Sequence, residues 1–156
     1  MDQATAALRE DHNRLQRLLT EFGQDAGSSS ANIYRRRRGA DALVAEFSAH
    51  LEIEQHCLDP VLRELPADKI GLVEQEAADR DQARQFMQTL LDADPQDTRF
   101  AAAAADLRAR IVRHIARQDG EVFPVLSAVG PERLAELGEQ LSQAGSHHLM
   151  HPNPSS

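Results

Sequence analysis

The chain has few of the features that mark secreted and membrane proteins. It has 156 residues and one cysteine, Cys57, so no disulfide can form within it, which favours a reducing, cytoplasmic setting. Residues 1–11 have neither the basic start nor the apolar run of a secretory signal. No apolar run reaches the length of about 18 residues that spans a bilayer. We therefore expect a soluble cytoplasmic protein of one domain with no membrane partner.

Positive charge and enzyme motifs are also scarce. With 17 Lys and Arg against 25 Asp and Glu, the formal net charge is −8, which argues against nucleic acid as a partner. The one basic run, Arg35 to Arg38, is expected to be a solvated helix start. The sequence has no hydrolase nucleophile motif and no phosphate-binding glycine loop. We therefore expect a binding protein rather than an enzyme.

Strand signals are nearly absent, and the helical period dominates the sequence. It predicts four long helices and a short fifth, at about residues 3–24, 31–65, 68–93, 95–128 and 131–143. A kink or break is expected at Pro60, because proline removes a backbone donor and clashes one turn back. These elements predict an all-α fold, an antiparallel up-down-up-down four-helix bundle over residues 1–143. The polar residues 144–156 are expected to form a disordered tail, whose histidines could bind metal adventitiously: His147, His148 and His151.

Several polar residues fall on the apolar faces of these helices. His50 and Glu54 are four residues apart, so they share one helical face. His12 and His114 lie among leucine and isoleucine residues at core spacing. A buried imidazole needs a hydrogen-bond partner or a metal, because an unpaired polar group costs on the order of 1–3 kcal/mol. Three histidines on three helices therefore predict one shared interior site.

Two stretches of the sequence match each other. "HLEIEQHCLDP" covers residues 50–60 and "HIARQDGEVFP" covers residues 114–124, so that each begins with histidine and ends with proline. At the position of Glu54, the second stretch has Gln118. The repeat indicates two matching helices.

These residues resemble the hemerythrin-like, or HHE cation-binding, domains over about residues 3–130. The resemblance is carried by "DHNRL" at 11–15, by "HLEIE" at 50–54, and by a histidine followed by "EVFP" on the last long helix. That family holds a non-haem di-iron centre in a four-helix bundle, bound by histidines from all four helices and bridged by two carboxylates. The resemblance implies that His12, His50 and His114 bind iron and that Glu54 bridges the two ions. Imidazole and carboxylate are both ligands that iron accepts.

The third long helix departs from the family pattern. Its stretch "DRDQARQFM", aligned on "DHNRLQRLL" of the first helix, has Arg80 where the first helix has His12. A guanidinium stays protonated and is not a metal ligand, so we expect Arg80 to pair with Glu54 or Asp119. Glu76, one turn before Arg80, is an alternative oxygen ligand on this helix.

The last long helix departs as well. Gln118 stands four residues after His114, where a carboxylate is common in the family. Asp119 follows it, at the offset where some members of the family have their bridging aspartate. To bind there it would need a long reach or a local π-type widening of the turn. We expect Glu54 to matter more to the interior than Gln118.

The sequence thus favours a hemerythrin-like protein that binds non-haem iron at an altered site and senses, carries or stores oxygen, nitric oxide or iron. The altered ligand positions leave open an unusual di-iron site or a partial site with a single metal. The candidate metal ligands are His12, His50, Glu54, Glu76, His114 and Asp119. The alternative, favoured by Arg80, is a metal-free helical bundle that acts as a protein-interaction or regulatory module. A ferritin-like di-iron oxidase is disfavoured, because such proteins use Glu-x-x-His pairs and "HLEIE" has the reverse order.

Overall fold

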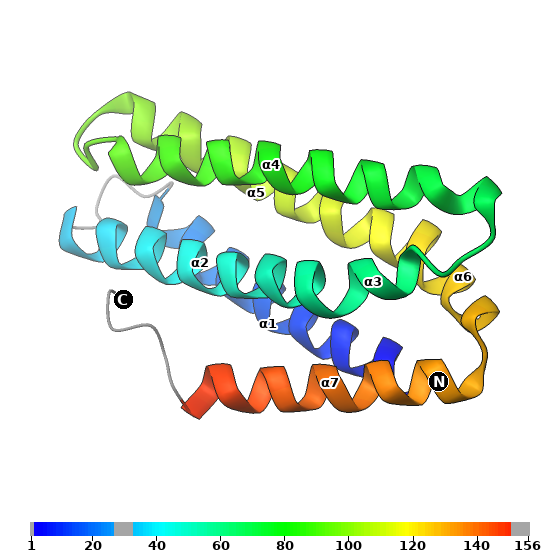
Figure 1. Cartoon of the computed structure of the whole chain (residues 1–156). Helices are drawn as coiled ribbons and strands as arrows, with labels where there is room; N and C mark the ends of the chain where they lie inside the picture. The colour runs from blue at the N-terminus through cyan, green and yellow to red at the C-terminus, as the bar shows by residue number, and fades with distance from the viewer. Residues whose placement is uncertain (1, 27–32, 151–156) are drawn as a thin grey trace.

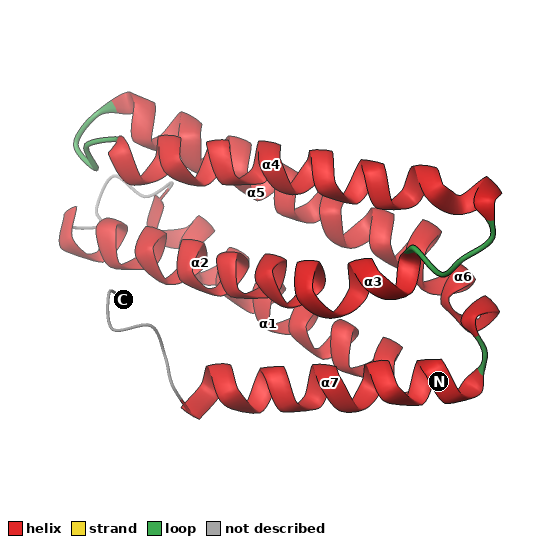
Figure 2. Ribbon diagram, in the orientation of Figure 1, coloured by secondary structure: helices red, strands yellow, loops and turns green. Residues whose placement is uncertain are grey.

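The computed structural model describes residues 2–26 and 33–150, which form a bundle of helices. The helices are α1 (Gln3–Ala26), α2 (Ile33–Ile53), α3 (Asp59–Leu62), α4 (Ile70–Asp92), α5 (Thr98–Arg117), α6 (Phe123–Leu126) and α7 (Pro131–Met150). Helices α1, α2, α4 and α5 lie lengthwise beside one another, and the colour gradient reverses direction from one to the next (Figure 1). These two ranges contain no strand (Figure 2). The predicted all-α bundle is confirmed.

Two π-helical turns interrupt the long helices at matching places. The turn Glu54–Leu58 joins α2 to α3, and the turn Gln118–Val122 joins α5 to α6. In both, the residue before the proline donates its backbone N–H to the carbonyl five residues back, from Asp59 to Glu54 and from Phe123 to Gln118. Proline has no N–H and clashes one turn back, which favours this wider turn. The helix therefore widens ahead of Pro60 and continues into α3, so of the expected kink or break, a break does not occur.

Helix α7 is longer than the short fifth helix that was expected. It runs to Met150, beyond the predicted start of the tail at residue 144. Its buried Leu137 and Leu141 pack in a cluster with Leu8 of α1. A helix anchored in this way extends at little cost, because each further residue adds a backbone hydrogen bond. The remaining part of the expected tail, residues 151–156, lies outside the described residues.

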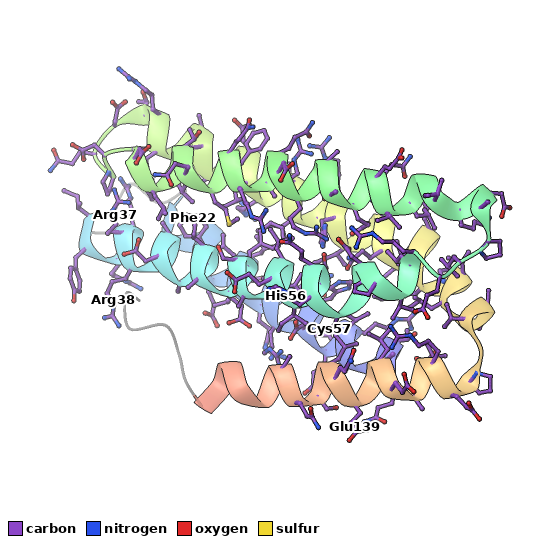
Figure 3. All side chains as sticks on the ribbon, in the orientation of Figure 1. Phe22, Arg37, Arg38, His56, Cys57 and Glu139 are labelled. Atoms are coloured by element: carbon purple, nitrogen blue, oxygen red, sulfur yellow. The ribbon has the colours of Figure 1, made fainter. Side chains whose placement is uncertain are left out.

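The basic run at the start of α2 has a structural role. Arg37, labelled in Figure 3, donates to the carbonyls of Leu91 and Ala93 at 2.9 and 2.6 Å. Arg36 donates to the carbonyl of Pro95 at 3.1 Å. The last carbonyls of a helix lack intrahelical partners, and cationic side chains satisfy them. Arg36 and Arg37 are therefore half-buried at the end of α4, while Arg35 and Arg38 are exposed as expected.

A polar layer divides the apolar core into two clusters. One cluster contains residues such as Leu15, Leu51 and Ile115, and the other contains residues such as Leu8 and Leu58. Between them each long helix contributes buried polar side chains: His12 from α1, His50 from α2, Glu76 and Arg80 from α4, and His114 from α5. The two apolar clusters fix the helices on both sides of this layer, so the polar side chains have little freedom to turn outward.

Candidate metal centre

The three predicted histidines meet in one interior region. The ring of His12 lies 5.2 Å from that of His50 and 6.4 Å from that of His114, centroid to centroid, and the rings of His50 and His114 are 5.5 Å apart. All three residues are buried. The shared site expected from helical periodicity is therefore present in the fold.

Two of these imidazoles are held from behind by carboxylates. His50 Nδ1 lies 3.0 Å from Asp11 Oδ2, and His114 Nδ1 lies 2.9 Å from Asp79 Oδ2. A carboxylate at Nδ1 fixes the tautomer and turns Nε2 toward the centre, as is typical of metal-binding histidines. Sequence reasoning missed both aspartates, although Asp11 and Asp79 are the first residues of the aligned stretches "DHNRLQRLL" and "DRDQARQFM".

Asp119 lies behind an imidazole rather than among the inward-facing ligand atoms. Its Oδ1 is 3.5 Å from His12 Nδ1 and 3.9 Å from Arg9 Nε, and its side chain is 44% exposed. The helix does widen here, but the turn begins at Gln118 and leaves Asp119 at the surface. The π-type turn is thus present, but it does not place Asp119 among the inward-facing ligand atoms.

Glu54 is the central acid of the cluster. Its Oε1 accepts hydrogen bonds from His114 Nε2 at 2.9 Å and from Gln118 Nε2 at 2.7 Å, and His50 Nε2 lies against the same oxygen. Burial raises the pKa of Glu54, but the positive charges of His114 and His50 outweigh burial and hold the pKa well below its usual range. Its Oε2 is buried and has no hydrogen-bond partner among the described residues. This carboxylate is thus charged and incompletely satisfied.

The imidazoles of His12 and His114 have opposite protonation tendencies. Burial and the neighbouring His50 lower the pKa of His12 to about 4, so it is neutral at physiological pH. Burial lowers the pKa of His114 too, but Glu54 and Asp79 outweigh it and raise the pKa to about 9. Without a metal, a proton on His114 therefore balances the charge of Glu54.

Gln118 is as deeply buried as Glu54 and donates to it, while the expectation that it matters less than Glu54 stays a prediction. It is fully buried, and its Oε1 accepts a hydrogen bond from His12 Nε2 at 2.7 Å. Its Nε2 donates to Glu54 and, at 3.1 Å, to Glu76 Oε2. The amide links side chains from three other helices, which a carboxylate in its place would not do without a metal or a proton.

Helix α4 contributes Glu76 to this network. Glu76 is buried, and its Oε1 accepts from Arg117 Nη2 at 2.8 Å. Burial and the nearby charge of Glu54 raise its pKa, against the opposing effects of His114 and Arg117. The alternative ligand predicted one turn before Arg80 thus lies in the cluster.

Arg80 is buried but points to a different partner from the one expected. Its Nη1 and Nη2 donate to Asp59 Oδ2 and Oδ1 at 3.0 and 2.9 Å. The expected pairing with Glu54 or Asp119 is wrong, because the wide turn after Glu54 directs Asp59 into the interior, where it accepts both donors. This planar two-bond geometry neutralises both buried charges.

The inward-facing side chains form two overlapping groups of potential ligands. We call His12, His50 and Glu54 half one, and Glu54, Glu76 and His114 half two; within each group one ligand atom from every residue lies within 4.8 Å of the others. Imidazole nitrogens and carboxylate oxygens, with a buried Glu54 oxygen left unpartnered, are a donor set that fits iron and similar divalent metals. Glu54 belongs to both halves, as a bridging carboxylate would.

Two other reactive residues lie apart from this centre. His56 is exposed, and Cys57 is half-buried in the same π-helical turn (Figure 3). Burial raises the pKa of the Cys57 thiol, which makes it less reactive.

Comparison with known proteins identifies one family. The family model described as the hemerythrin HHE cation binding domain matches residues 3–126. A search of curated proteins and a search of solved structures each gave no match. The match spans every residue of both halves.

Proposed function

The chain belongs to the hemerythrin HHE cation binding domain family, and on this premise we propose that it binds a pair of non-haem iron ions. Half one holds one ion and half two the other, with Glu54 shared between them. Within that role the protein senses, carries or stores oxygen, nitric oxide or iron, and it acts as a binding protein rather than an enzyme.

One observation carries this proposal. Three buried imidazoles turn Nε2 toward a common centre, while each Nδ1 faces an aspartate on another helix. A histidine that served packing alone would need one hydrogen-bond partner, whereas His50 and His114 each have an aspartate behind them and Glu54 in front. The centre also holds two buried carboxylates, Glu54 and Glu76, whose charge a metal would neutralise.

The residues of the chain would bind and orient the metal pair. Asp11 and Asp79 hold the imidazoles of His50 and His114 with their Nε2 atoms inward. His114 must release its proton before Nε2 can bind a metal. The amide of Gln118 donates a hydrogen bond to Glu54. The two apolar clusters keep bulk water away from the centre. Bound iron would supply the redox chemistry needed to respond to oxygen or nitric oxide.

A metal-free regulatory bundle is the second candidate, and two contacts favour it. Arg80 and Asp59 neutralise each other, and the amide of Gln118 connects Glu54 with Glu76. Both contacts stabilise buried charge without a metal. Glu54 Oε2 lacks a partner among the described residues, however, so this network is incomplete.

Metal uptake separates the two candidates. The full chain with alanine at His147, His148 and His151 removes adventitious binding by these imidazoles, and it is titrated anaerobically with ferrous iron. We expect two irons per chain, one for each half, and near-ultraviolet absorption after oxidation. Loss of that uptake in His50→Ala, but not in the exposed His56→Ala, ties the iron to the centre. A colourless protein with no bound iron would exclude the di-iron proposal and favour the metal-free bundle.

Part of the interpretation stays a prediction. The described residues contain no helix long and apolar enough to cross a membrane. Location in the cytoplasm and the absence of a nucleic-acid partner are still expected on the sequence grounds given above.

A further inference from the structure

The two halves share one backbone arrangement. In both, a histidine precedes a fully buried Glu54 or Gln118 by four residues, and this buried residue begins a π-helical turn that ends two residues before a proline. In both, an aspartate from the preceding long helix holds the histidine, at 3.0 Å in one half and 2.9 Å in the other. The backbone thus offers two equivalent positions, and differences in metal binding must come from the side chains.

Half one is rich in nitrogen donors. It offers two imidazoles, His12 and His50, and one shared carboxylate, Glu54. The ring of His12 stacks on Phe123, with centroids 5.5 Å apart and planes 14° apart. This stacking keeps the His12 imidazole at the centre.

Half two is rich in oxygen donors. It offers two carboxylates, Glu54 and Glu76, and one imidazole, His114. Arg117 also donates to Glu76, so a metal there shares this carboxylate with a guanidinium. Imidazole suits zinc and iron, whereas carboxylate suits manganese and magnesium.

A paired change in sequence accounts for this difference. In the aligned stretches Arg80 replaces the imidazole of His12, and Asp59 replaces the ring of Phe123. In half one an imidazole stacks on an aromatic ring, whereas at the equivalent place in half two a guanidinium pairs with a carboxylate. Arg80 is directed to Asp59, so it leaves Glu76 as the ligand from α4.

Building on the proposed function, we propose that the two metal positions differ in kind. Half one is a nitrogen-rich position that strongly prefers Zn²⁺ or Fe²⁺ over Mn²⁺. Half two is an oxygen-rich position that discriminates less between these ions. The chain therefore accommodates a mixed pair, with a borderline transition metal in half one and Mn²⁺ in half two. The Arg80–Asp59 pair maintains the difference.

Zinc and manganese measure the two positions separately. The metal-free full chain, with alanine at the three tail histidines, receives one equivalent of Zn²⁺ and is then titrated with Mn²⁺. Uptake is followed by loss of the electron paramagnetic resonance signal of free Mn²⁺, and retained zinc is measured after desalting. We expect one Mn²⁺ to bind while the zinc stays. We also expect the Zn²⁺ to Mn²⁺ affinity ratio to be lower in half two than in half one by on the order of tenfold or more.

Two other outcomes would overturn the proposal in different ways. If the Zn²⁺ to Mn²⁺ affinity ratio is the same at both positions, or if Mn²⁺ displaces the first Zn²⁺, the two positions do not differ as proposed and only this inference fails. If neither ion nor iron binds, the proposed function fails with it.

Variants test which residues cause the difference. Asp59→Phe with Arg80→His gives half two the side chains of half one, and we expect the affinity ratio in half two to rise on the order of tenfold. Should this double variant fail to fold, Glu76→Gln provides a second test, because it should lose Mn²⁺ binding and keep the zinc. Glu74→Gln, an exposed glutamate on the same helix, is the matched control and should change neither. An unchanged ratio in the double variant, or unchanged Mn²⁺ binding in Glu76→Gln, contradicts the assignment.

Discussion

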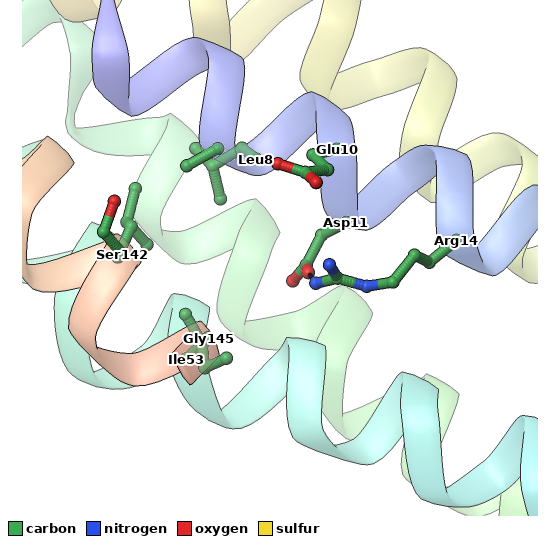
Figure 4. A pocket seen from close by; sticks show the side chains of 9 residues that line it. Leu8, Glu10, Asp11, Arg14, Ile53, Ser142 and Gly145 are labelled. Atoms are coloured by element: carbon green, nitrogen blue, oxygen red, sulfur yellow. Dashed lines mark ion pairs between the residues drawn. The ribbon is translucent and has the colours of Figure 1, made fainter. Parts of the chain in front are cut away.

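The halves of the centre differ in how their charges are satisfied without a metal. In half one, the neutral His12 donates to Gln118, and Asp11 behind His50 also pairs with Arg14 beside a cavity of about 230 Å³ between α1, α2 and α7 (Figure 4). In half two, a protonated His114 lies between Glu54 and Asp79, and Arg117 covers Glu76. A metal in half two must therefore displace a proton and part of an ion pair, while a metal in half one must replace the hydrogen bond from His12 Nε2 to Gln118.

This difference shows how one repeated backbone can support two chemistries. The repeat fixes where Nε2 of each histidine points, because the supporting aspartates and π-helical turns are the same. Side chains near the histidines, such as Arg117 beside Glu76, then determine how much positive charge the protein itself supplies to each half. Where the chain supplies more positive charge, as in half two, a metal has less to neutralise.

The largest effect is expected at Glu54, because it belongs to both halves. Glu54→Ala should abolish metal binding in both. In the metal-free protein it should lower the free energy of unfolding by about 3–5 kcal/mol, since it leaves a buried, protonated His114 without its main partner. Metal content and urea unfolding measure the two effects. Glu52→Ala, an exposed change on the same helix, is the control. Retention of one metal by Glu54→Ala would mean that the halves do not share this carboxylate.

The next effect is expected at the Arg80–Asp59 pair, which exists only on the side of half two. Arg80→Ala should cost about 3–5 kcal/mol of unfolding free energy, because it leaves Asp59 buried and unpaired. Arg80→Met combined with Asp59→Leu should recover most of that loss, since it removes both charges. Arg84→Ala, which breaks an exposed pair with Asp81, should change little. Equal losses from Arg80→Ala and the double variant would show that packing, not charge, dominates here.

The halves should also respond to pH in opposite directions. The folded pKa of His114 is raised from 6.5 to about 9, so its contribution to stability is complete below pH 6.5 and is lost as the pH rises to about 9. The folded pKa of His12 is lowered from 6.5 to about 4, so its contribution is present above pH 6.5 and is lost as the pH falls to about 4. Each shift corresponds to on the order of 3 kcal/mol.

Urea unfolding of the metal-free protein from pH 4 to 9.5 measures these two slopes. The curve of His114→Gln should lack the loss above pH 6.5, and the curve of His12→Gln should lack part of the loss below it. If His114→Gln keeps the full alkaline loss, its proton is not what balances Glu54.

Helical periodicity predicted the inward histidines, since His12, His50 and His114 all lie on regular helices among apolar neighbours. It could not place residues after the wide turns. One extra residue in a turn rotates everything that follows by about 100° around the helix axis, so the burial of Asp59 and its pairing with Arg80 were missed. The role of Gln118 was missed for another reason. An amide that links three helices has no sequence pattern of its own, because its partners come from distant segments.

The smallest effects are expected from the aspartates that contact Nδ1 of the three histidines, and these aspartates differ in how exposed their side chains are. Asp11→Asn should weaken metal binding in half one, and Asp79→Asn in half two, by about 10–100-fold each, because each removes the charge that orients a histidine. Asp119→Asn should change the affinity of half one much less. Its side chain is 44% exposed and 3.5 Å from His12 Nδ1, so water can take its place as acceptor. Zinc titration of the three variants, with each affinity compared with that of the parent chain, ranks the three aspartates by their effect on metal binding. If Asp119→Asn lowers the metal affinity of half one as much as Asp11→Asn does, Asp119 moves inward when metal binds and acts as a ligand after all.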